Sequence, residues 1–154
     1  MTRSFSTAKY GRMINIELVE LDKLKPHEGV DSAHLRELKE EIKSDGILKF
    51  AIAVNKDRNI ILDGHHRVAA LKELGCAKTP VVFVDYNSSG IEVQSQRKGI
   101  RLTKKEIIKA GLGSKKFPPK TSRHMIKIRD ALRHITAIEK RVNIPLEELK
   151  EGNK

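Results

Sequence analysis

The sequence predicts an α+β (α/β) fold, with a small mixed sheet flanked by helices in the front part and a helical C-terminal part. Short β-branched runs alternate with amphipathic stretches up to about residue 100, as in a sheet with helices packed on it. From Thr103 onward the pattern is helical. The chain has 154 residues, of which 38% are hydrophobic, and this suits one compact domain.

The first hundred residues contain clear element boundaries. Residues 1–12 are expected to form a flexible lead. One helix begins after Asp31, a favoured N-cap, and ends at Gly46, a residue type that commonly stops helices. A second helix covers 67–74 and ends at Gly75. The expected strands are 13–21, 47–55, 60–62, 80–86 and 91–96.

The last third is expected to be built of helices. Thr103 to Glu106 has the form of a capping box, and it opens a short helix that closes near Gly111. After a loop rich in Gly and Lys at 113–120, we expect a long helix from about Arg123 to Val142, followed by a final turn at 145–149.

Composition limits the partners of the chain. The net charge is +11, from 31 Lys and Arg against 20 Asp and Glu, which indicates a polyanionic partner, either nucleic acid or nucleotide phosphates. Aromatic residues make up 4%, too few for stacking on single-stranded nucleic acid. No apolar run approaches the roughly 20 residues of a membrane helix, so we expect no membrane partner. The single cysteine, Cys76, fits a reducing cytoplasm.

The segment 60–71 is the most informative part of the chain. An apolar strand ends in Asp63-Gly64, and His65-His66-Arg67 lead into a helix. The first N–H groups of a helix lack partners within the helix, and the helix dipole adds positive charge there. Such a terminus binds anions, so we predict a phosphate site. A strand-to-helix turn with surface histidines is the structural alternative, although no core requires this cluster of polar residues.

Two other places carry candidate chemistry. Glu28 lies on a loop just before a helix, where a carboxylate can act as a general base on a substrate hydroxyl. A second basic segment follows a di-proline and is expected to begin another helix, with Thr121 or Ser122 as its cap; its residues are Lys120, Thr121, Ser122, Arg123 and His124. Two basic helix starts in one small domain are expected to converge on one polyanion.

The sequence also indicates which metal ion the site suits and which nucleotide-binding motifs it lacks. Asp63 beside a phosphate site suits Mg²⁺, which uses one or two carboxylates together with phosphate oxygens. A zinc site is not expected, because Cys76 is the only thiol and no histidines lie at helical i, i+4 spacing. Neither the phosphate loop of P-loop enzymes nor the dinucleotide fingerprint of three glycines is present.

These motifs resemble those of the ParB/sulfiredoxin superfamily, and within it the free serine kinases. The resemblance spans roughly residues 14–135 and is carried by Pro26-His27-Glu28, Ile61-Leu62-Asp63-Gly64-His65-His66-Arg67, Ala69-Ala70-Leu71-Lys72-Glu73-Leu74-Gly75, Val84-Asp85-Tyr86 and Pro118-Pro119-Lys120-Thr121-Ser122-Arg123-His124. Sulfiredoxins need a catalytic cysteine in this motif, where this chain has His65. The resemblance implies a nucleotide-binding core of this type at 13–100 and a helical part at 101–154 that completes the active site.

By this resemblance, the chain is expected to transfer a phosphoryl group from ADP, or from ATP, to free L-serine. The product would be O-phosphoserine, which feeds cysteine synthesis. Glu28 would be the base, and Asp63 would position Mg²⁺ or the reacting hydroxyl. The residues implied for the nucleotide are Gly64, His65, His66, Arg67 and Thr121, and those implied for serine or the transferred group are Lys120, Ser122, Arg123 and His124.

Two alternatives remain open at this point. Gln96 stands where the resemblance implies a tryptophan of the amino-acid pocket, so the identity of the acceptor is open. A ParB-type DNA-binding protein or a nucleotide-dependent regulator would also use the positive charge, with Thr103 to His134 as a helix-turn-helix-like pair. Only a kinase needs the carboxylate of Glu28 beside the phosphate site. The oligomeric state is not predicted.

Overall fold

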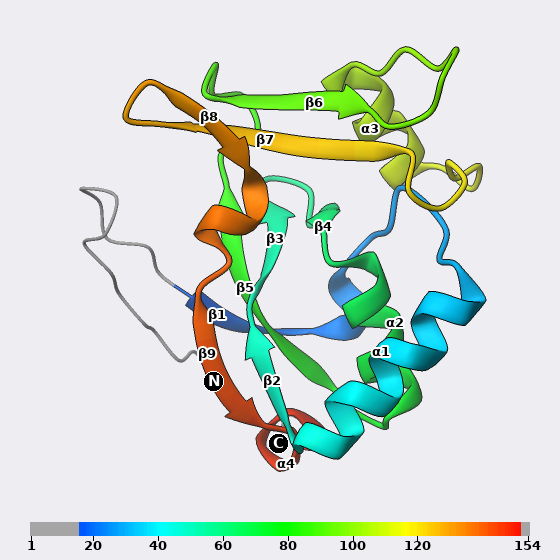
Figure 1. The fold of residues 1–154 in the computed structure, drawn as a ribbon, viewed down its shortest axis with the longest axis vertical. Helices are drawn as coiled ribbons and strands as arrows, with labels where there is room; N and C mark the ends of the chain where they lie inside the picture. Colours follow the sequence, from blue (N-terminus) through cyan, green and yellow to red (C-terminus); the bar gives the residue numbers. More distant parts are fainter. Residues whose placement is uncertain (1–15, 152–154) are drawn as a thin grey trace.

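The computed structural model describes residues 16–151 and has a mixed α+β fold (Figure 1). In this part of the chain, four α-helices accompany a four-stranded, a two-stranded and a three-stranded sheet. The expected fold class is therefore confirmed, while the flexible lead expected at 1–12 lies outside the described residues. None of the described helices is both long enough and apolar enough to cross a membrane.

The four-stranded sheet is the centre of the fold. Its order is β1 (Ile16–Glu20), β5 (Lys78–Val84), β3 (Ile52–Asn55) and β4 (Ile61–Asp63). β3 is parallel to β5, and the other two pairs are antiparallel, so the sheet is mixed as expected. Successive residues of a strand point to opposite faces of the sheet. Accordingly, Ile52 and Ala53 belong to two separate hydrophobic cores, one on each face.

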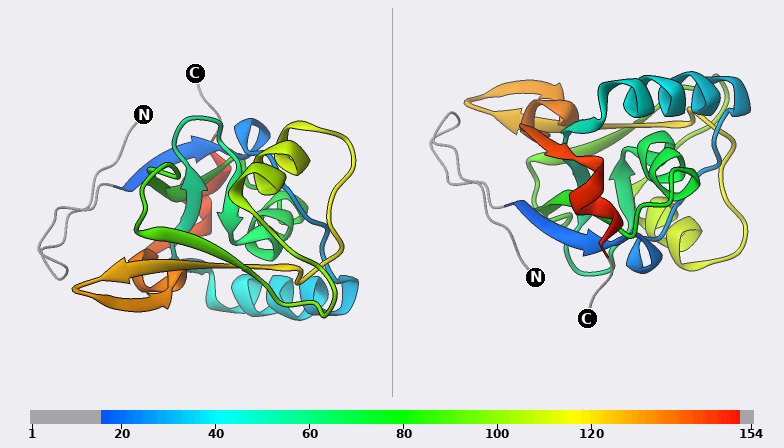
Figure 2. Two further views of the ribbon diagram at one scale, coloured as in Figure 1. Left: turned by 90° about the horizontal axis from the view of Figure 1, so that it is seen from above. Right: turned by 90° about the horizontal axis from the view of Figure 1, so that it is seen from below.

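Three helices surround the strand end from which β4 leads into α2. They are α1 (Ser32–Asp45), α2 (His65–Glu73) and α3 (Lys104–Leu112), and the views in Figure 2 show α2 between the other two. The side chain of Asp31 caps α1 by accepting the Ala33 N–H at 3.1 Å, and Gly46 ends it at a φ of 70°. Both bonds of the capping box at Thr103 are present. The boundaries of α1 and α3 confirm the sequence-based expectation, whereas α2 begins two residues before the expected Arg67.

The apolar run 47–55 forms two strands rather than one. β2 (Ile47–Phe50) pairs with β9 (Arg141–Pro145), whereas β3 joins the central sheet. The break falls at Ala51, which is fully buried and donates its N–H to the Lys140 carbonyl. β9 leads into the short helix α4 (Leu146–Lys150), and 3₁₀ turns lie at Leu21–Lys23 and Ile135–Ile138.

The long helix expected from Arg123 to Val142 is wrong. This region contains β7 (Ser122–Ile128) and β8 (Ala131–His134), which form a three-stranded antiparallel sheet with β6 (Ile91–Ser95). A two-residue turn joins β7 to β8, and its residues Arg129 and Asp130 have φ of 49° and 65°. Two positive φ values in a two-residue hairpin turn match the twist of the flanking strands and reverse the chain. The expectations of a helical C-terminal part and of a helix-turn-helix-like pair from Thr103 to His134 are therefore both wrong.

Candidate active site

The loop that carries Glu28 is held between the central sheet and a segment from far along the chain. On one side, Lys25 pairs with residues 59–61: its N–H bonds the Asn59 carbonyl, and its own carbonyl accepts the Ile61 N–H. On the other side, the N–H of Gly29 donates to the Phe117 carbonyl, and the N–H of Phe117 donates to the His27 carbonyl. Both backbones are therefore paired, and the loop is fixed beside residues 117–122.

A cavity of about 310 Å³ opens at the strand-to-helix junction, within the size range of ligand sites. Its walls come from the Glu28 loop, α1, the end of β4, the start of α2, the end of β6 and the start of β7. The lining residues are Glu28, His34, Leu38, Leu62, Asp63, Gly64, His65, His66, Arg67, Gln96, Lys120 and Ser122. The structure thus brings together most of the residues that the sequence singled out.

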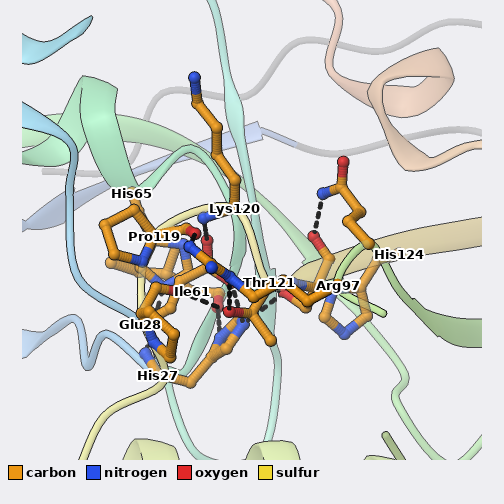
Figure 3. A network of polar contacts seen from close by, with 12 residues as sticks. His27, Glu28, Ile61, His65, Arg97, Pro119, Lys120, Thr121 and His124 are labelled. Atoms are coloured by element: carbon orange, nitrogen blue, oxygen red, sulfur yellow. Dashed lines mark hydrogen bonds and ion pairs between the residues drawn. The ribbon is translucent and has the colours of Figure 1, made fainter. Parts of the chain in front are cut away.

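Glu28 is a buried carboxylate with three strong donors. Oε2 accepts the Lys120 N–H at 3.0 Å, and Oε1 accepts the Ser122 N–H at 3.2 Å and the Ser122 hydroxyl at 2.8 Å (Figure 3). Burial raises the pKa of Glu28, but hydrogen bonding with His27 and Ser122 and the proximity of His65 outweigh it and lower the pKa to about 2. Since a carboxylate has about four acceptor positions, one remains on Oε2.

The two histidines of the motif bind the Glu28 loop to α2. Nε2 of His65 accepts the His27 N–H at 3.1 Å, and Nε2 of His66 accepts the Asp31 N–H at 2.9 Å. Burial, followed by the neighbouring His27 and His34 respectively, lowers the pKa of both histidines, which agrees with neutral rings that accept at Nε2. The expectation that no structural need explains this cluster is therefore wrong, because both rings satisfy backbone N–H groups of the loop.

Arg67 is similarly engaged. Its guanidinium donates to the Phe50 and Ala51 carbonyls, to Asp63 Oδ2 at 3.1 Å and to Glu139 Oε1 at 2.7 Å. Burial raises the pKa of Glu139, and the Arg67 guanidinium opposes that rise. Arg67 thereby fixes the start of α2 to the segment before β9 and orients Asp63 toward the cavity. The N-terminus of α2 itself has no side-chain cap, and Gly64 precedes it at a φ of 112°.

The second basic segment begins a strand, not a helix, and only part of it reaches the cavity. Lys120 and Ser122 line the cavity. Thr121 is fully buried and donates its hydroxyl to the Pro118 carbonyl at 2.6 Å. Since successive strand residues face opposite sides, Arg123 is exposed. His124 is 1% exposed and contacts the Tyr86 hydroxyl at 2.8 Å in the core. The structure therefore does not bring Thr121, Arg123 or His124 to the cavity.

Sequence reasoning also missed residues that line or support the cavity. His34 and Leu38 reach the cavity from α1, and the ring of His34 stacks on His66 at 4.2 Å between ring centres. Their i, i+4 spacing was the available signal, since such residues share one face of a helix. Glu139 was hidden in the segment expected to be a helix. Within residues 16–151, no group of three or more His, Cys, Asp or Glu residues is placed to hold a metal ion.

Sequence comparisons relate this chain to one known family. Residues 2–95 match the model of the ParB N-terminal domain. An ATP-dependent L-serine kinase of Staphylothermus marinus is 38% identical over 82 residues, covering 51% of this chain and 32% of that protein. An ADP-dependent L-serine kinase, SerK, of Thermococcus kodakarensis is 35% identical over 86 residues, covering 53% of this chain and 36% of that protein. The matched segments thus span about a third of these curated relatives.

Solved structures confirm the fold. A free serine kinase in complex with AMP superposes with a TM-score of 0.74 at 18% sequence identity, covering 96% of this chain and 95% of that chain. At this level of identity, the likeness establishes the arrangement of strands and helices.

Proposed function

This chain belongs to the ParB N-terminal domain family, and from that premise we propose that it is a kinase that transfers a phosphoryl group from ADP or ATP to the hydroxyl of free L-serine. One observation carries the proposal: a buried carboxylate, Glu28, meets the uncapped N-terminus of α2 in a single cavity. The names of the relatives support a serine kinase, and since one is ATP-dependent and the other ADP-dependent, both donors stay in the proposal.

The start of α2 is proposed to bind the phosphates of the nucleotide. Phosphoryl transfer spreads negative charge over the transferred oxygens, so catalysis consists mostly of positioning and of stabilising that charge. The N-terminus of a helix supplies N–H donors and a favourable dipole, and Gly64 to Arg67 line the cavity at this point. Lys120, whose side chain is 58% exposed, lines the cavity and adds a cation to it. Its ammonium extends away from Glu28 (Figure 3).

Glu28 is proposed to act as the base. Its remaining acceptor position on Oε2 receives the hydroxyl hydrogen of the acceptor, and three donors hold the carboxylate in place. As the acceptor oxygen bonds to the terminal phosphorus, the bond from phosphorus to the nucleotide oxygen breaks, and Glu28 takes the proton. The products are O-phosphoserine and AMP, or ADP when ATP is the donor.

Asp63 is the proposed ligand for Mg²⁺. Its side chain is 28% exposed and lines the cavity, so one carboxylate would face the phosphates. Such a donor set fits Mg²⁺, which commonly takes one or two carboxylates and fills its remaining positions with phosphate oxygens and water. When bound, the ion would neutralise part of the phosphate charge.

We also propose that residues 13–100 bind the nucleotide and that residues 101–154 complete the active site. The second part supplies Lys120 and Ser122, both of which contact Glu28. Gln96 lines the cavity next to Ser122, whose carbonyl accepts its amide N–H at 2.7 Å. This position beside Ser122 supports a role for Gln96 at the acceptor side of the site. A cytoplasmic location is part of the same proposal.

The test is a serine-dependent turnover assay with ADP or ATP and Mg²⁺, in the wild type and in the Glu28→Gln variant. We expect O-phosphoserine from the wild type and a loss of about 10²–10⁴-fold in the variant, the usual contribution of a general base. Glu37→Gln, on the exposed face of α1, removes the same charge away from the cavity and is the matched control. L-threonine, assayed in parallel, tests the acceptor.

Nucleotide binding by calorimetry checks that Glu28→Gln still folds. A wild type that binds nucleotide but forms no phosphoserine with either donor would refute the serine-kinase proposal. In that case the salt dependence of binding to duplex DNA tests the alternative regulator, because contacts to many phosphates give a steep dependence.

A further inference from the structure

Three atoms beside the cavity form a closed polar triangle. Oγ of Ser122 lies 2.8 Å from Oε1 of Glu28 and 2.7 Å from Nε2 of His27, and the last two atoms are 3.4 Å apart. His27 is fully buried, and Nδ1 of its ring lies 2.7 Å from the Ile61 carbonyl oxygen. A carbonyl only accepts, so Nδ1 carries a hydrogen, and Nε2 carries a second one only when the ring is charged.

Two short contacts among three atoms require two hydrogens. The Ser122 hydroxyl brings one and can direct it to Glu28 or to His27, but not to both. With an ionised Glu28 and a neutral His27, one contact would join two lone pairs at less than 3 Å. An ionised carboxylate, a hydroxyl and a neutral imidazole together lack one of the two hydrogens that these contacts need. The geometry therefore fits a unit that has taken up one additional proton.

We infer that Glu28, Ser122 and His27 form one proton-accepting unit, in which the proton removed from the acceptor hydroxyl ends on Nε2 of His27. This step rests on the proposed kinase function. Glu28 takes the proton, which weakens the hydrogen bonds to its carboxyl group because bonds to a charged acceptor are about twice as strong as bonds to a neutral one. The carboxyl group then turns to present the proton to Ser122. The Ser122 hydroxyl then passes its own hydrogen to Nε2 and receives the one from Glu28. Glu28 is ionised again, Ser122 is unchanged, and His27 is an imidazolium.

Passing the proton on returns Glu28 to its ionised form, so a second site for the proton makes the base effective. Nε2 of a neutral imidazole whose Nδ1 carries the hydrogen is a proton acceptor, which suits that site. His27 does not touch the acceptor and is a positioning residue that acts through Glu28.

Other titratable groups face the unit from α2, from β7 and from the loop before β7. His65 of α2 and His124 of β7 have ring centres 4.5 Å and 5.7 Å from that of His27. Burial lowers the pKa of His65 and brings the pKa of His124 to about 3, so both stay neutral in the working range. Lys120 adjoins Glu28 through its N–H, and its ammonium lies toward Asp31 at 3.8 Å. His65, His124 and Lys120 adjoin the unit, whereas His27 contacts the Ser122 hydroxyl directly.

The first experiment is the pH dependence of kcat/KM for serine phosphorylation. In the wild type, we expect kcat/KM to fall about tenfold per pH unit on the acid side, where the unit is already protonated. His27→Gln keeps a polar partner for Ser122 but does not titrate, and should move this acid limb down by at least about one pH unit. Ser122→Ala should shift the limb as well, and Ser122→Thr, which keeps the hydroxyl, should restore it. His134→Asn is the control.

The second experiment does not depend on activity: nitrogen NMR of the His27 ring across the same pH range. We expect Nδ1 to remain protonated throughout, and protonation of Nε2 to move to lower pH by at least about one unit in Glu28→Gln. An acid limb unchanged in His27→Gln, or the same Nε2 titration in wild type and Glu28→Gln, would overturn the inference. Absence of phosphoserine from the wild type would instead refute the proposed function, while the NMR result would still decide whether the unit exists.

Discussion

Gly64 connects β4 to α2 at the point where the central sheet comes closest to the cavity. Replacing it by alanine would place a Cβ atom 2.6 Å from Cγ2 and 2.9 Å from Cβ of Ile52. Ile52 is fully buried in β3, with strands on both sides, so it cannot move aside. We therefore predict that Gly64→Ala destabilises the protein and displaces the start of α2.

Two effects set the size of this loss. The φ of 112° at Gly64 strains any residue with a Cβ, which costs about 1–3 kcal/mol. Overpacking against a fixed core side chain costs about 1–3 kcal/mol more. Together they predict a decrease of about 4 kcal/mol in the free energy of unfolding. Gly46→Ala provides the matched control, since Gly46 also has a positive φ, 70°, but nothing lies within 4 Å of its added Cβ. Its loss should be about 1 kcal/mol.

Equilibrium unfolding in urea measures both variants, and calorimetry measures their affinity for the nucleotide. Ile52→Ala removes Cγ2, so it should cost less in the Gly64→Ala background than in the wild type, with a coupling of about 0.5–3 kcal/mol. A loss in Gly64→Ala within about 0.5 kcal/mol of that in Gly46→Ala would refute the clash with Ile52 as the reason for glycine at this position.

Other predictions concern a buried histidine and two ion pairs. Because the pKa of His124 is about 3 in the folded protein and near 6.5 when unfolded, the unfolded chain takes up the proton first as pH falls. Stability should therefore decrease by about 1.4 kcal/mol per pH unit on this account below pH 6.5, and the slope of urea stability against pH should be smaller by that amount in His124→Gln. Arg67→Met leaves Glu139 buried without its cation and should cost about 3–5 kcal/mol, whereas Lys39→Ala, which breaks the partly exposed pair with Glu73, should cost about 0–1 kcal/mol. Equal losses in urea would contradict the assignment of Arg67.

Elements whose ends carry their own local signal could be predicted from the sequence. Asp31 and Gly46 bound α1, and the Thr103 capping box opens α3, because caps act through residues only two to four positions away. The hairpin of β7 and β8 could not be predicted in the same way. Its turn uses Arg129 and Asp130 at positive φ, without the Asn-Gly or Asp-Gly pair that marks such turns.

The candidate site was likewise predictable only in part. The convergence of Glu28 with the start of α2 was expected, and both line the cavity. The histidines of the motif were interpreted as phosphate ligands, but their Nε2 atoms already accept backbone N–H groups of the loop. Contacts of this kind join residues 35 to 38 positions apart, and the sequence carries no local trace of them.

The donors that hold the Glu28 carboxylate come from residues 92 and 94 positions later in the chain. During synthesis, the loop around Glu28 therefore emerges long before Lys120 and Ser122, and until then none of their three hydrogen bonds to the carboxylate can form. Contacts of such long range form late and slow the folding of a domain. Ile144 and Leu149 pack in the hydrophobic core, where they are 1% and 0% exposed, and the ribosome adds them later still. A nascent chain that ends at residue 95 would contain every residue that matches the ParB N-terminal domain model, but not the groups that give Glu28 a fixed position.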